Sequence, residues 1–227
     1  MADALHKPYV RLAKLEELDR IAEMQRRAFI ADPVFNYFGR VKATPDPSPP
    51  FPESPSQTTP TAPEGGLEEL GGMMIWCPPH KRVSPSNVRA LLRTGPLKPL
   101  KVWGPGGLWR FATTPIHSER VMKRGFKAHR ATISPEDAWY LLLACTDPAH
   151  EGKGFMSLLT REAFAHAPGS VFTVEGSTAK SRDRYAHFGF TDIRPVVLGK
   201  GKVDERGYVA KGAAATGFTV YSQIKWK

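Results

Sequence analysis

The sequence predicts an α/β fold in which helices cover a parallel or mixed sheet. Six consecutive apolar residues at 139–144 run into the break Thr146-Asp147-Pro148. A short continuous apolar run of this kind is typical of a strand that is buried on both faces. A segment with helical apolar spacing and a second apolar run at 171–174 follow it. A strand, a helix and a strand of this length predict a right-handed βαβ unit with parallel strands.

The N-terminal part predicts a strand, a long helix and a short aromatic segment. Residues 9–12 are expected to form the strand, and residues 14–30 carry apolar positions at helical spacing. The pair Asp32-Pro33 ends that helix. Residues 34–38 are expected to form a further helical turn or part of a substrate-facing wall. Packing of Phe35, Tyr37 and Phe38 in the core is the simpler interpretation.

A Pro-rich segment interrupts the chain at residues 43–64, which contain eight prolines and almost no apolar side chains. Such a segment buries too little surface to offset its chain entropy. We expect a disordered insertion within a single domain that spans residues 1–227, because a predicted strand at 71–76 follows directly. Residues 86–93 are expected to be helical and residues 104–107 a loop. The second half of 108–126 is expected to be a helix that ends near Gly125.

The C-terminal part continues the alternation of helices and strands. Residues 154–167 are expected to form a helix that Pro168-Gly169 ends. A short helix at 181–188 follows, with Ser181 as a possible N-cap and Gly189 as a C-cap. Residues 190–193 are expected to resume as a strand. Residues 218–226 alternate between apolar and polar side chains, which predicts a last strand with one covered face.

The composition is that of a soluble globular protein with an anionic partner. Hydrophobic residues make up 41% of the chain and charged residues 24%. A net charge of +10 favours nucleic acid, a membrane surface or a phosphorylated cofactor as partner. The basic residues are scattered rather than massed, so we expect no nucleic-acid partner, and we expect no membrane partner either. The N-terminus lacks the apolar core of a signal peptide, and no apolar run is long enough to span a membrane, so a cytoplasmic location is expected.

The cysteines and histidines indicate neither a metal site nor a disulfide framework. Cys77 and Cys145 lie far apart in the sequence, and the seven histidines show no metal-ligand spacing. Cys145 is also a poor candidate for a covalent nucleophile, because no accompanying histidine and carboxylate can be identified around it.

A glycine loop between the first βαβ strand and its helix is the strongest candidate for a ligand site. Gly152 and Gly154 tolerate positive φ and close backbone approach, which loops with inward amides require. The positive end of the helix dipole lies at the same point, beyond the carboxyl ends of the parallel strands, where a phosphate can bind. A flexible turn without a ligand explains the spacing equally well.

Two segments in this region together resemble a known family. The run LLLACTDPAHEGKGFMSLL at 141–159 resembles the acetyl-CoA-binding motif of the GNAT N-acetyltransferases, and SRDRYAHFGF at 181–190 resembles the helix that follows in that family. The WYL of the strand and the DPVF at 32–35 are closest to the branch of the puromycin N-acetyltransferase-like enzymes. The resemblance implies a mixed, mostly antiparallel central sheet with a parallel βαβ cofactor unit and helices on both faces.

The resemblance also implies a cofactor site. Thr146, with Cys145 beside it, matches the strand end whose backbone pairs with the pantetheine arm, and Ser181 matches a coenzyme-contacting polar residue. The residues that match the pyrophosphate cradle are Glu151, Gly152, Lys153, Gly154, Phe155, Met156 and Ser157. Glu151 and Met156 depart from the family pattern, which has Gln or Arg and Gly or Ala at these positions.

The expected catalytic residues are Tyr185 and Glu175. Tyr185 matches the family's general acid, and a phenol is protonated at neutral pH and roughly matched to a thiol leaving group. Packing of Tyr185 beside Phe188 and Phe190 is the structural alternative. Glu175, at the end of the second βαβ strand, is the expected general base, with Asp32 and His117 as the other candidates.

The function expected from these observations is transfer of an acetyl group from acetyl-CoA to the amine of a small molecule, of xenobiotic or secondary-metabolite type. The amine would attack directly in a ternary complex, without a metal, and the protein would be a monomer or a homodimer. The alternative is a catalytically degenerate coenzyme-A-binding GNAT module with a sensing or scaffolding role.

Overall fold

The computed structural model describes residues 8–42, 69–82 and 97–227 of the chain. The predicted Pro-rich insertion at 43–64 and the predicted helix at 86–93 lie outside the described residues.

The centre of the structure is a five-stranded sheet with the order β1-β2-β3-β5-β4. Its strands are β1 (Gly72–Cys77), β2 (Trp139–Thr146), β3 (Phe172–Gly176), β4 (Asp192–Leu198) and β5 (Phe218–Lys225). The pair β2 and β3 is parallel, and the other three neighbouring pairs are antiparallel. The mixed, mostly antiparallel sheet with a parallel βαβ unit is therefore confirmed.

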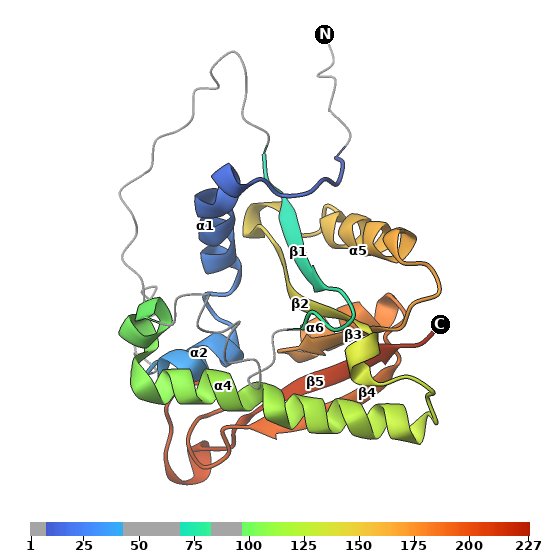
Figure 1. Cartoon of the computed structure of the whole chain (residues 1–227). Helices are drawn as coiled ribbons and strands as arrows, with labels where there is room; N and C mark the ends of the chain where they lie inside the picture. The colour runs from blue at the N-terminus through green and yellow to red at the C-terminus, as the bar shows by residue number, and fades with distance from the viewer. Residues whose placement is uncertain (1–7, 43–68, 83–96) are drawn as a thin grey trace, which may run out of the picture.

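Helices cover both faces of this sheet. They are α1 (Leu18–Ala28), α2 (Pro33–Gly39), α4 (Leu97–Ala128), α5 (Phe155–His166) and α6 (Ala179–His187). In Figure 1, α1 and α5 flank β1 and β2, and α4 crosses the sheet near β5 and β4. The described residues also include short 3-10 turns at Leu15–Glu17, Pro135–Asp137, Pro148–His150 and Gly212–Ala214. No helix among the described residues is long and apolar enough to cross a membrane.

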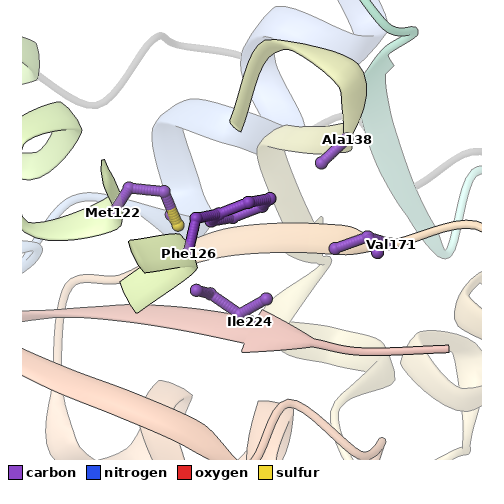
Figure 2. Close-up of a cluster of buried hydrophobic side chains, with 5 residues drawn as sticks. All are labelled: Met122, Phe126, Ala138, Val171 and Ile224. Carbon is purple, nitrogen blue, oxygen red and sulfur yellow. The ribbon is translucent and has the colours of Figure 1, made fainter. Parts of the chain in front are cut away.

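Two apolar clusters show which helix lies on which face. On one face, Leu141, Phe172 and Val174 pack against Tyr185 of α6 and against Phe190. On the other face, Met122 and Phe126 of α4 pack over Ile224 of β5, as Figure 2 shows. Because side chains alternate along a strand, Thr173 and Glu175 point to the α4 face, away from Phe172 and Val174.

The last strand differs from the sequence prediction of one covered face. Ser222, Gln223 and Ile224 are all buried, so the C-terminal half of β5 is covered on both sides. The buried amide of Gln223 donates to the carbonyl oxygens of Arg182 and Phe190, at 3.1 Å each. These hydrogen bonds let a polar residue occupy a buried position, which is why hydrophobic alternation did not reveal the covered face.

Two other local predictions were wrong. Residues 9–12 form no strand, and the side chains of Tyr9 and Leu12 remain exposed. Residues 104–107 form no loop, because two helical parts of α4 meet there directly at a kink at Gly104, the one non-helical residue. A Cβ atom at Gly107 would lie 2.6 Å from the carbonyl oxygen of Phe38, so this glycine permits close packing of α4 on α2.

Candidate active site

The two parallel strands separate at their carboxyl ends. The register pairs Trp139 with Phe172 and ends with Leu141 beside Val174, whereas β2 continues along β1 to Thr146. The edge of β2 that faced β3 therefore has no strand partner over residues 142–146 in the described sheet. Leu142 in this stretch is 45% exposed. An extended ligand arm could hydrogen-bond to these backbone groups as a further strand would.

The glycine loop lies directly beyond β2 and leads into α5. Gly152 and Gly154 have φ angles of +80° and +83°, in the left-handed region that favours glycine. A Cβ atom at either position would meet no atom within 4 Å, so backbone conformation and not crowding requires glycine here. Gly154 is the N-cap of α5, and the first-turn amides at 155–157 have no acceptor within the helix.

The two residues that depart from the family pattern each have a partner outside the glycine loop. The carboxylate of Glu151 is largely exposed and lies 3.1 Å from the ammonium group of Lys180 on α6. The side chain of Met156 packs against the buried cluster around Leu141 and Phe172. Neither side chain therefore places uncompensated charge or bulk at the loop.

The other cradle residues are held by local contacts. The ammonium group of Lys153 lies 2.9 Å from Nδ1 of His150, whose Nε2 lies 2.8 Å from Glu69. The ring of Phe155 meets His150 edge to face at 5.6 Å. Ser157 is partly buried in the first turn of α5. A groove of about 650 Å³ between α1 and the segment after β2 lies beside this loop and includes His150 and Asp147 in its lining.

Ser181 has a different helix position from the expected one. Thr178 is the N-cap of α6, and Ser181 is the third helical residue, so the N-cap prediction was wrong. The two side chains form a capping box, in which the amide of Ser181 donates to Thr178 Oγ1 and the amide of Thr178 donates to Ser181 Oγ. These two hydrogen bonds fix the side chains of Thr178 and Ser181 at the N-terminus of α6.

Cys145 and Thr146 end β2 at the point where it has left β3. The thiol of Cys145 is buried, and burial together with the charge of Asp147 raises its pKa to about 11. A thiol with this pKa is protonated at neutral pH, which argues against covalent catalysis. Thr146 pairs with Gly72 of β1, where a Cβ atom would lie 3.0 Å from the carbonyl oxygen of Cys145.

Tyr185 lies on α6 with its ring in the buried cluster and meets Phe190 edge to face at 5.9 Å. Burial, and then the nearby Asp32 carboxyl group and Cys145 thiol, raise the pKa of Tyr185 above that of a free tyrosine. The phenol is therefore protonated at neutral pH. The ring packs in the core, as the structural alternative expected, and the role of Tyr185 as proton donor stays a prediction.

Asp32 is the carboxyl group in the neighbourhood of Tyr185. It caps α2 through the amide of Val34 at 2.9 Å, and it accepts a hydrogen bond from Ser177 Oγ at 2.5 Å. Burial raises the pKa of Asp32, and the bonds from Ser177 and Val34 oppose that rise. Sequence analysis missed Ser177. Its position directly after the end of a parallel strand was a usable signal, because ligand-facing residues gather there.

Glu175 lies on the opposite face of the sheet from the Tyr185 ring. Its carboxylate is 3.0 Å from the guanidinium of Arg82, and both side chains are mostly buried. Burial raises the pKa of Glu175, whereas Arg82 and the hydroxyl groups of Ser118 and Tyr140 lower it. His117, the third candidate base, is exposed on α4 with Nδ1 3.2 Å from the carbonyl oxygen of Thr113. Within residues 8–42, 69–82 and 97–227, no cluster of metal-binding side chains is found.

Comparison with known proteins gives only a distant structural likeness. No family model and no curated protein matches the chain. One similar solved structure, from Corynebacterium glutamicum, is described as histone acetyltransferase HPA2 and related acetyltransferase. It is 18% identical to this chain, with a TM-score of 0.47 and 96% of each chain covered. Mosquito arylalkylamine N-acetyltransferase like 5b is 15% identical, with a TM-score of 0.49, covering 95% of this chain and 97% of the other.

Proposed function

We propose that the protein is an acetyltransferase of the GNAT type that transfers an acetyl group from acetyl-CoA to a small amine. The observation that carries this proposal is the separation of β2 from β3 near Tyr185, at the end of β2 that leads into the glycine loop. An extended arm with an anion at one end and a reactive thioester at the other fits such an arrangement. The unpaired edge of β2 would bind the arm, and the first-turn amides of α5 at 155–157 would bind the pyrophosphate.

Asp32 is the better general base of the two carboxylates. A base must lie near the reacting amine and must be free to accept a proton. Asp32 is close enough to Tyr185 for its charge to raise the pKa of that phenol, and the pKa of Asp32 itself is raised. Glu175 instead forms an ion pair with Arg82 on the other face of the sheet. We therefore assign to Asp32, held by Ser177, the part that sequence analysis gave to Glu175.

The proposed reaction is a direct transfer in a ternary complex. The amine nitrogen attacks the thioester carbonyl carbon and gives up its proton to Asp32. A backbone N–H near Thr146 stabilises the oxyanion of the tetrahedral intermediate. The carbon–sulfur bond then breaks, and the departing thiolate takes a proton from Tyr185, leaving an amide and free coenzyme A.

The acceptor amine is proposed to carry an apolar or aromatic group. The rings of Phe29 and Phe35 are tilted by 42° with centroids 5.2 Å apart, and Phe35 is only partly buried close to the cap residue Asp32. A partly exposed aromatic pair next to the proposed base suits an apolar amine. Phe38 belongs to the core instead, where it packs against Trp103 and Phe111.

Thiol release from acetyl-CoA, measured with a panel of aromatic and aliphatic amines, tests this function. Loss of a general acid lowers kcat by about 10²-fold, so Tyr185→Phe is expected to lose that factor with little change in the KM for acetyl-CoA. Tyr208→Phe, in the loop that precedes β5, is the matched control and should retain wild-type rates. Wild-type protein that binds acetyl-CoA but turns over no amine would instead be the coenzyme-A-binding module.

A further inference from the structure

A buried polar cluster on the α4 face is not used by the proposed chemistry. It brings together Arg82 from the segment after β1, Tyr140 of β2, Glu175 of β3 and Ser118 of α4. The guanidinium carbon of Arg82 lies 3.7 Å from the centroid of the Tyr140 ring, and Arg82 Nη2 lies 3.0 Å from Glu175 Oε1. The side chains of Arg82 and Glu175 are only 17% and 20% exposed. One guanidinium therefore contacts both strands of the parallel pair.

The cluster lies at the point where these strands separate. Tyr140 pairs with Thr173, and the next pair, Leu141 with Val174, is the last one between β2 and β3. Glu175 directly follows Val174, so Arg82 bridges the two strands across the end of their ladder. Beyond this bridge, β2 stays with β1 and β3 stays with β5.

We propose that Arg82 is a positioning residue that, with Tyr140 and Glu175, forms a clasp fixing where β2 and β3 separate. The inference rests on the proposed function, in which the separated strand edge binds the pantetheine arm. A fixed point of separation sets the distance between the backbone groups of β2 and Tyr185, and hence the fit of the thioester between them.

The chemistry of the clasp favours fixed geometry over simple stability. A partly buried ion pair recovers little more than its desolvation cost, so apolar residues would stabilise the sheet as well. A guanidinium, however, can stack on a ring and hydrogen-bond to a carboxylate at the same time, in one orientation. Lysine cannot do both. Ser118 is fully buried on α4, and its hydroxyl lowers the pKa of Glu175, so the clasp also contacts α4.

Amide hydrogen exchange without any ligand tests the clasp independently of activity. In Arg82→Gln and Arg82→Lys, exchange is expected to rise about tenfold in peptides covering 139–146 and 172–177, and to stay unchanged in β4. The control is Arg194→Gln, which removes a partly buried ion pair with Asp192 on β4, 2.9 Å long. Unchanged exchange at the two parallel strands, or an equal rise throughout the sheet, would overturn the proposal.

Steady-state kinetics separate the clasp from two other roles for the same residues. The clasp predicts that Arg82→Gln, Glu175→Gln and the double variant each raise the KM for acetyl-CoA by about tenfold. The effects are not additive, because either single substitution already removes the interaction between the two residues. A raised KM for the amine alone would make the cluster an acceptor site, and additive effects would make the two residues independent. Either result overturns the clasp. A wild-type protein that binds no acetyl-CoA overturns the proposed function instead, and the hydrogen-exchange experiment then decides whether the clasp exists.

Discussion

At the scale of single residues, the two carboxylates near the end of β3 differ in what surrounds them. Asp32 accepts hydrogen bonds from a serine and a backbone amide, and Glu175 pairs with a cation. Burial raises the pKa of both groups, but the ion pair with a guanidinium makes Glu175 a weaker base toward the substrate amine. The division of roles between base and positioning group follows from these partners.

The pH dependence of kcat/KM distinguishes the two. The proposed base must be ionised, so activity falls as pH falls through the folded-state pKa of Asp32, which lies above the usual value of about 3.9. Asp32→Asn is expected to lower kcat/KM by about 10²-fold and to remove this acidic limb. Glu175→Gln should retain the fall of activity at acidic pH when acetyl-CoA is saturating. Loss of the limb in Glu175→Gln, with its retention in Asp32→Asn, would restore Glu175 as the base.

Residue-level prediction from sequence succeeded where the cause is local. Positive φ at Gly152 and Gly154 is confirmed, because two glycines in a short strand-to-helix turn have few other reasons to occur together. The environment of Glu175 could not be predicted, since its partner Arg82 is 93 residues away in the chain. Ser177 and Asp32 are separated by 145 residues, and no sequence pattern links them.

At the scale of elements, the glycine loop and α5 form a unit whose conformation is needed for anion binding. Alanine in the left-handed region costs roughly 1 kcal/mol. Gly154→Ala is therefore expected to lower the free energy of unfolding by about that amount and to weaken acetyl-CoA binding as well, because the cradle amides turn. Chemical denaturation and calorimetry measure the two effects.

Gly201→Ala is the matched control for this loop. Gly201 has a φ of +77° and, like Gly154, meets no atom within 4 Å of an added Cβ, but it lies in the segment between β4 and β5. It should show the same loss of stability with unchanged affinity. Equal loss of affinity in both variants would show that the loop conformation has no specific role.

Element boundaries were predictable where apolar spacing is regular and unpredictable where glycine has a packing role. The expected strand at 139–144 and helix at 154–167 correspond to β2 and α5. The glycines at 104–107 suggested a loop, yet close approach to α2 explains Gly107 within a helix. Residues 9–12 form no strand, although their apolar side chains predicted one.

At the scale of the whole molecule, a small apolar core joins α4 to the sheet. Ile224 is fully buried beneath Met122 and Phe126 and connects β5 to this helix (Figure 2). Removing its side chain leaves a cavity, so Ile224→Ala is expected to lower the free energy of unfolding by about 2–5 kcal/mol. Urea denaturation measures this value. A loss below about 1 kcal/mol would show that α4 is not anchored at Ile224.

The strand order could not be derived from periodicity alone. Alternation and apolar runs predicted individual strands, and the length of the crossover predicted that β2 and β3 are parallel. The placement of β5 between β3 and β4 depends on pairs such as Val174 with Gln223, which are distant in the sequence. Only the resemblance to the GNAT enzymes implied a mostly antiparallel sheet, and the structure confirms it.

Calorimetric titration of the full chain with acetyl-CoA tests the central claim most directly. The proposed site predicts saturable binding of one molecule per chain, with a Kd in the range of about 1 μM to 1 mM that is typical of enzyme substrates. Gly154→Ala should bind more weakly than Gly201→Ala. Folded wild-type protein that gives no binding heat and no thermal stabilisation at millimolar acetyl-CoA would contradict the account.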